Sequence, residues 1–108
     1  MTQKDFGDIL ATSGYPVTYL AFPADKCPPM PFITFQEVGS NNVGADGIVY
    51  KKVKVYQVDL FTAQKDETAE AALESAFETN GIFWNKYQTI EDTEACQIYT
   101  YTIEVLGG

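Results

Sequence analysis

The side chains of this chain that could carry acid–base chemistry are its carboxylates. The 108 residues include 15 Asp and Glu, seven Lys and Arg, and no His. Without histidine the chain lacks the commonest general base, the usual partner of a nucleophilic Ser or Cys, and a frequent zinc ligand. Two carboxylates can still act as general acid and general base, as in glycoside hydrolysis. The candidates for such a pair are Asp46, Asp59, Glu91, Asp92, Glu94 and Glu104.

None of these carboxylates lies in a recognisable catalytic motif. The run from Glu91 to Glu94 is dense in acids, but it lacks the alternating D-x-[DN]-x-[DN]-G loop of a calcium site. Gly44 and Gly47 lack the lysine spacing and the following helix of a phosphate-binding loop. We therefore expect that the protein is not an enzyme and that it binds no metal or cofactor.

The overall charge narrows the range of partners. The formal net charge is −8 at pH 7, and contacts to phosphates need clustered Lys and Arg, so direct binding of nucleic acid is disfavoured. The charge favours a basic partner, or a surface past which DNA slides without binding. No apolar run approaches the ~20 residues of a membrane span, so we expect no membrane contact. We expect residues 1–108 to form a single domain.

The segment from Ser40 to Asp66 is the most informative part of the chain. Residues 39–47 form a polar, glycine-bearing loop that buries too little to hold a core. They join a strand at residues 32–38 to a long strand at residues 48–62, most simply as a β-hairpin with an extended tip. The long strand carries apolar residues on both faces. A β-bulge near Tyr56-Gln57 explains this pattern. A second explanation is that the two ends of the strand are buried against different surfaces, one of which belongs to another subunit.

We expect two helices, one on either side of this hairpin in the sequence, and each has a residue that can cap its N-terminus. Thr2 can cap the first helix, with Asp5 at the reciprocal capping-box position. Asp66 caps the second helix at residues 67–79, in which Leu73 belongs to the apolar stripe. Acidic residues repeat on the other side of that helix: Glu67, Glu70, Glu74 and Glu78.

The remaining strands complete the expected fold. They are residues 17–22 and residues 96–105, the second of which follows a link around Phe83-Trp84 and a polar turn at residues 91–94. The fold class is α+β: a single domain with a mostly antiparallel β-sheet and two helices packed on one face. The expected order is α-β-β-β-α-β(-β), where the bracketed strand is optional.

Several stretches of the sequence resemble a known family. The runs SNN…ADG-x-VYKK, DLFT, QKD, FW-x-K and IYTYTIEV, with GYPVTYLAFP and PPMPFITF before them, resemble small virion proteins of long-tailed bacteriophages and prophages of Gram-positive bacteria, specifically the tail-terminator (tail-completion) type. The resemblance implies a small α/β sandwich and a ring, typically a hexamer, on the last disc of the tail tube. That ring stops tube growth and offers the surface to which the filled head attaches. No residue of such a protein is catalytic.

The resemblance also implies partners and a location. The partners are further copies of the chain, the major tail protein and a head-completion or neck protein, while genomic DNA passes through without specific binding. The protein would lie in the tail or neck of the virion, after assembly in the cytoplasm of the bacterial host.

We predict an assembly interface from the residue types that suit contact between subunits. Lys52 and Lys54 belong to the basic cluster of an acidic chain and would meet the acidic helix face of a neighbouring subunit. The alternatives are a hairpin tip without a role, lysines that protect a strand edge, and a solvated helix face. The predicted interface residues are Ser40, Asn41, Asn42, Val43, Lys52, Lys54, Glu70 and Glu74.

Two other functions stay open. Another neck component, a head-completion or connector-adaptor protein, would share the size, acidity and ring formation. A small acidic DNA mimic that inhibits a nucleic-acid-binding protein belongs to a different class. It would need acids spread over one face like phosphates, whereas the acids here concentrate in the second helix and at residues 91–94, with lysines between.

Overall fold

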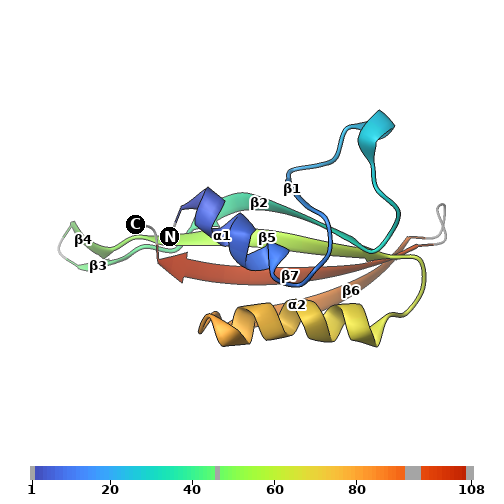
Figure 1. Cartoon of the computed structure of the whole chain (residues 1–108). Helices are drawn as coiled ribbons and strands as arrows, with labels where there is room; N and C mark the ends of the chain where they lie inside the picture. Colours follow the sequence, from blue (N-terminus) through green and yellow to red (C-terminus); the bar gives the residue numbers. More distant parts are fainter. Residues whose placement is uncertain (1, 46, 92–95, 107–108) are drawn as a thin grey trace.

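A computed structural model describes residues 2–45, 47–91 and 96–106, and the elements follow one another along the chain as Figure 1 shows. They are α1 (Gln3–Ala11), β1 (Val17–Tyr19), the 3₁₀ turn η1 (Ala24–Lys26), β2 (Phe32–Ser40), β3 (Val43–Ala45), β4 (Ile48–Lys51), β5 (Val53–Thr62), α2 (Glu67–Thr79), β6 (Trp84–Glu91) and β7 (Cys96–Leu106).

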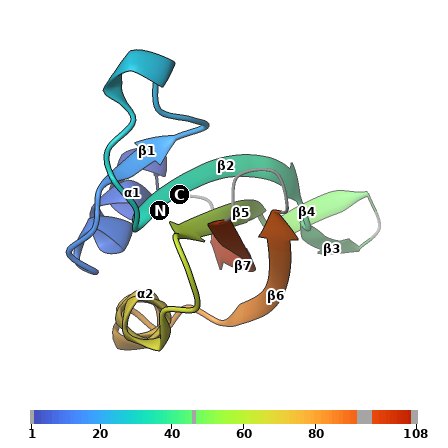
Figure 2. The ribbon, with the colours of Figure 1, turned by 90° about the vertical axis from the view of Figure 1, so that its right-hand side faces the viewer.

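The fold is α+β, as the sequence predicts. Five strands form one sheet in the order β1-β2-β5-β7-β6, in which only the β1–β2 pair is parallel. Both helices pack on the same face of this sheet (Figure 2). With the short β3–β4 pair set aside as an insertion between β2 and β5, the order is α-β-β-β-α-β-β, which confirms the prediction.

The helix starts are also confirmed. The Thr2 hydroxyl accepts a hydrogen bond of 3.1 Å from the Asp5 amide, and the Asp5 carboxylate accepts one of 3.1 Å from the Thr2 amide. These bonds favour the ionised acid and lower the pKa of Asp5. The Asp66 side chain accepts a bond of 3.0 Å from the Ala69 amide at the start of α2. Neither α-helix in the described part of the chain combines the length and apolar character that crossing a membrane requires.

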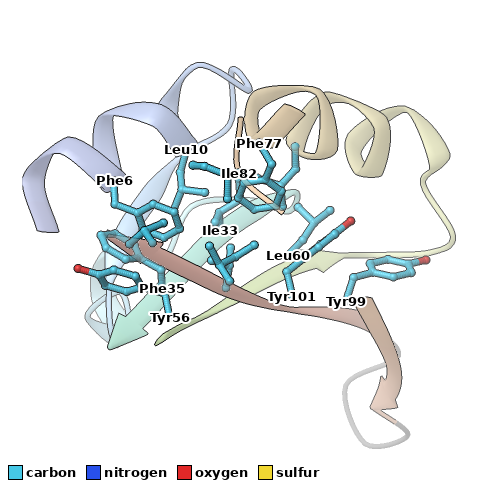
Figure 3. Packing of buried hydrophobic residues seen from close by; sticks show 14 of the residues in the cluster. Phe6, Leu10, Ile33, Phe35, Tyr56, Leu60, Phe77, Ile82, Tyr99 and Tyr101 are labelled. Atoms are coloured by element: carbon cyan, nitrogen blue, oxygen red, sulfur yellow. The ribbon is translucent and has the colours of Figure 1, made fainter. Parts of the chain in front are cut away.

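The core lies between the helices and the sheet, and aromatic rings fill much of it (Figure 3). The Phe6 ring of α1 stacks on Tyr56 of β5 with centroids 4.5 Å apart. The Phe77 ring of α2 meets Tyr101 of β7 at 5.5 Å. Each helix is therefore held to the sheet by an aromatic pair as well as by its aliphatic stripe.

The strands differ from the prediction in two places. The first strand is shorter than residues 17–22 because Leu20, with φ of 68°, takes a left-handed conformation that ends it. The bulge predicted near Tyr56-Gln57 lies instead on the partner strand, since the register shifts between Glu37 and Gly39 of β2. Strand β5 alternates regularly, so the prediction of a bulge in it was wrong.

The segment after α2 forms a full strand rather than a link. Strand β6 pairs along its whole length with β7, from Trp84 opposite Ile103 to Glu91 opposite Cys96. The optional strand of the predicted order is therefore present and forms an edge of the sheet. The polar turn expected at residues 91–94 lies, apart from Glu91, outside the described residues.

Candidate functional site

The predicted polar loop is a hydrogen-bonded arm. Strands β3 and β4 pair with each other as a separate antiparallel sheet that continues the β2–β5 hairpin beyond the body of the protein (Figure 1). We call residues 41–52 the arm. The molecule measures 49 Å along its longest axis and 26 and 23 Å across it. The expected hairpin with an extended tip is confirmed, whereas the expectation of an irregular loop was wrong because most of the segment pairs as strands.

Two asparagines fix the base of the arm. The Asn41 amide donates to the Val53 carbonyl at 2.9 Å, and the Val53 amide donates to Asn42 Oδ1 at 3.1 Å. Asn41 Nδ2 also donates to Glu104 Oε1 of β7 at 2.9 Å. Because these bonds replace regular pairing where β2 and β5 give way to the arm, both side chains have a structural role there.

The other predicted residues of this group lie close by. Ser40 is opposite Lys54 in the β2–β5 ladder, and Val43 is opposite Lys51 in the arm. Lys52 is exposed at the break between β4 and β5, whereas Lys54 is half-buried. The structure thus brings six of the predicted interface residues together, in the arm and at its base: Ser40, Asn41, Asn42, Val43, Lys52 and Lys54.

Glu70 and Glu74 do not belong to a solvated acidic stripe, which corrects that expectation. Glu70 is only 4% exposed and forms ion pairs with Lys65 at 3.1 Å and Lys86 at 2.9 Å. Glu74 Oε2 pairs with Lys86 at 2.8 Å and accepts a hydrogen bond of 2.7 Å from the Tyr101 hydroxyl. We call these five residues the ion-pair network; it ties α2 to β6 and β7.

The environment shifts the protonation equilibria of this network. Burial raises the pKa of Tyr101 well above its ordinary value, and the hydrogen bond to Glu74 raises it further. Burial opposes ionisation of Glu70, but hydrogen bonds from Lys86 and Lys65 outweigh it and hold the pKa of this carboxyl below its ordinary value. Burial likewise opposes the charge on Lys86, yet Glu74 and Glu70 keep its pKa raised. The charges of Glu70 and Lys86 are therefore present near neutral pH.

The arm and the ion-pair network are separate sites. Lys54 is opposite Val105, and Tyr101, which contacts Glu74, is opposite Val58. Four residues of strand separate these positions, about 13 Å at the usual rise of ~3.3 Å per residue. Within one molecule the predicted lysines therefore do not neutralise Glu74, and in a neighbouring molecule they would compete with Lys65 and Lys86.

The two candidate catalytic carboxylates that the structure describes, Asp59 and Glu104, do not form a pair. Asp59 accepts hydrogen bonds from Thr100 Oγ1 at 2.8 Å and from Gln57. Glu104 lies four residues further along β7 from the position opposite Asp59, about 13 Å away and beyond the ~5–9.5 Å that separates paired carboxylates in glycosidases. Asp46, Asp92, Glu94 and the Glu91 side chain fall outside the description. No cluster that could hold a metal ion occurs among the residues that are described.

The lysine partners of the acidic helix were missed in the sequence. Lys86 faces α2 because it lies two residues from Trp84 on β6, and both side chains point to the covered face of the sheet. Its Nζ is 5.8 Å from the centre of the Trp84 ring. The alternation of Trp84 and Lys86 was a usable signal, but only once residues 84–91 were assigned as a strand.

The fold of the chain is shared with a solved structure. No protein-family model and no curated protein matches the sequence. Among solved structures, the chain is similar to a chain in the structure described as the virion of a native gene transfer agent (GTA) particle. The TM-score is 0.59 at 14% identity, over 92% of this chain and 84% of the other. At this identity the likeness shows a shared fold.

Proposed function

We propose that this chain is a structural subunit of a phage-type virion and, within it, the tail-terminator subunit. Copies would form a ring on the end of the tail tube, stop its growth and provide the surface for head attachment. The observation that carries the proposal is the similarity in fold, over 92% of the chain, to a chain of a virion particle. The sequence runs that resemble tail-terminator proteins span the same elements.

The arm supports a role in assembly. It projects from the body as a two-stranded hairpin that extends away from both α-helices of the described chain (Figure 1). Such a ribbon has too little apolar surface to be stable alone in water, and its free edges can pair with another strand. The asparagine bonds at its base hold it in a fixed direction. An extended element of this kind suits contact with a neighbouring subunit.

The charge distribution suits a protein that DNA passes. The net charge of −8 repels phosphates at long range, so a ring of such subunits would let the genome slide. We propose no catalytic activity, because the described carboxylates Asp59 and Glu104 are hydrogen-bonded and far apart.

A head-side neck component would share these features, and we keep it as the alternative. A DNA mimic is less well supported. Glu70 and Glu74, at the centre of the acidic helix, are neutralised by Lys65 and Lys86 and do not present free charges in a phosphate-like array.

The test is co-sedimentation of the purified protein with tail tubes assembled from the cognate major tail protein, followed by electron microscopy. DNA-filled heads without tails serve as the parallel target. We expect density at one tube end and no further growth of capped tubes when tail protein is added. Capture by heads instead of tubes would assign the protein to the head side of the neck. Binding to neither would refute the virion assignment.

A further inference from the structure

The two edges of the main sheet offer very different amounts of backbone for pairing. Strand β1, at one edge, has three residues and ends at the left-handed Leu20. Strand β6, at the other, has eight residues, and within the described chain β7 is its only partner strand (Figure 2). A long open edge presents unpaired amide and carbonyl groups that another strand can bind. The β6 edge is therefore the larger site for strand addition.

Among the β6 side chains that the structure describes, residues 84–87, the only charged one is Lys86. Edges are commonly guarded by exposed or inward-pointing charges, but the charge of Lys86 is neutralised by Glu70 and Glu74. Two aromatic side chains are exposed to solvent here: Phe83, just before the strand, is 77% exposed, and Tyr87, within the strand, is 63% exposed. Exposed aromatic groups beside open backbone are typical of a protein contact.

The arm of a second copy has the shape and charge to fit this edge. It is itself a ribbon of strands that extends past the body, and it carries the exposed Lys52. Helix α2 borders β6 through the ion-pair network and exposes Glu67 and Glu78. An arm laid along β6 would bring a basic ribbon next to an acidic helix, so the charges would favour this pairing over contact between two arms.

We infer that the arm of one copy pairs with the β6 edge of the next copy and extends its sheet. This inference rests on the proposed function, whose ring needs a contact of this type. The arm and the β6 edge are different surfaces of the same chain, so the contact is head-to-tail: each copy gives one arm and receives one. Contacts of this class close into rings when the rotation between neighbours permits it.

Disulfide trapping between two different single-cysteine chains tests the inference. One chain carries Gly44→Cys in the arm, where the glycine is exposed, and the other carries Tyr87→Cys on β6. Both chains also carry Cys27→Ser and Cys96→Ser. The matched control replaces Tyr87→Cys with Asp25→Cys, a position that is also exposed but lies in η1. The cross-link is read on denaturing gels, first in free protein at high concentration and then on tail tubes.

We expect the Gly44→Cys and Tyr87→Cys chains to form a mixed dimer at least tenfold faster than the control pair. A rate equal to the control in both settings, or faster coupling of two Gly44→Cys chains to each other, would overturn the inference. Tube ends that are capped without the arm-to-edge cross-link would overturn it and leave the proposed function standing. A mixed dimer in free protein that never binds tubes would support the contact and refute the tail-terminator role.

Discussion

Lys86 should stabilise the fold more than Lys65 or Lys4, whose ion pairs lie nearer the surface. Its Nζ donates to Glu70 at 2.9 Å and to Glu74 at 2.8 Å, and its side chain is 31% exposed. Hydrogen bonds to charged groups contribute ~1.5–3 kcal/mol net, and removing one partner of a fully buried pair costs ~3–5 kcal/mol. Because Lys65 still pairs with Glu70 and water reaches Lys86, we expect Lys86→Met to lower the free energy of unfolding by about 2 kcal/mol.

Urea unfolding at pH 7, followed by far-ultraviolet circular dichroism, measures this loss. With a slope of ~1–3 kcal/mol per molar urea, the midpoint should fall by roughly 1 M. Lys65→Met removes a half-exposed partner, and Lys4→Met removes an exposed pair with Asp8 on α1. The loss in unfolding free energy should be largest for Lys86→Met, smaller for Lys65→Met and smallest for Lys4→Met. A midpoint for Lys86→Met equal to that of Lys4→Met would refute the argument that burial makes this network stabilising.

The same network predicts the direction of a pH effect. The pKa of Glu70 in the folded protein lies below its ordinary value of 4.5. Its ionised form therefore stabilises the fold fully above about pH 4.5, and the stabilisation disappears as the pH falls through the folded-state pKa. The difference in unfolding free energy between the wild-type protein and Lys86→Met should accordingly shrink below that pH. A difference that stays constant down to pH 3 would show that it arises from packing instead.

Three further changes test other parts of the molecule. Asn42→Ala removes the acceptor of the Val53 amide, so hydrogen exchange should speed up at Val53 and in the arm with a loss of global stability below ~1 kcal/mol; unchanged exchange would contradict its role at the base. Lys52→Glu should weaken ring assembly on tail tubes at low salt and have less effect at ~0.5 M salt, while Lys4→Glu should leave assembly unchanged; equal effects of the two would exclude a specific contact. Phe6→Ala empties a fully buried site and should cost ~3–5 kcal/mol in chemical unfolding; a loss below ~1 kcal/mol would mean that α1 is not integral to the core.

Features set by neighbouring residues could be predicted from the sequence. Thr2 with Asp5, and Asp66 with Ala69, fix the helix starts through bonds that span three residues. The pairing of β2 with β5 followed from a polar turn between two apolar runs. The bulge shows the limit of such reasoning: apolar residues on both faces of β5 favoured a bulge near Tyr56-Gln57, but β5 pairs regularly with β7 and the register shift lies between Glu37 and Gly39 of β2.

The ion-pair network could not be predicted because it joins residues that are distant in sequence. A helical wheel puts Glu70 beside Phe77 at the border of the apolar stripe, and this position alone does not decide between a buried and a solvated side chain. Its burial depends on Lys86, sixteen residues away, which reaches it only because β6 pairs with β7 in one register. Asn41 and Glu104 are likewise 63 residues apart in the chain. Local patterns give no access to contacts of this kind.

The position of Trp84 gives the protein a built-in optical reporter. It is the only tryptophan of the chain, and its ring lies 5.7 Å from that of Tyr101 and 5.8 Å from the Lys86 ammonium. A charge at this distance shifts the emission of an indole, and the neighbouring tyrosine can transfer excitation to it. The emission of Trp84 would therefore follow the docking of α2 against β6 without a label, and the arm contains no tryptophan that would add to it. A strand laid along β6 would change the same signal, so one spectrum could follow both folding and ring closure.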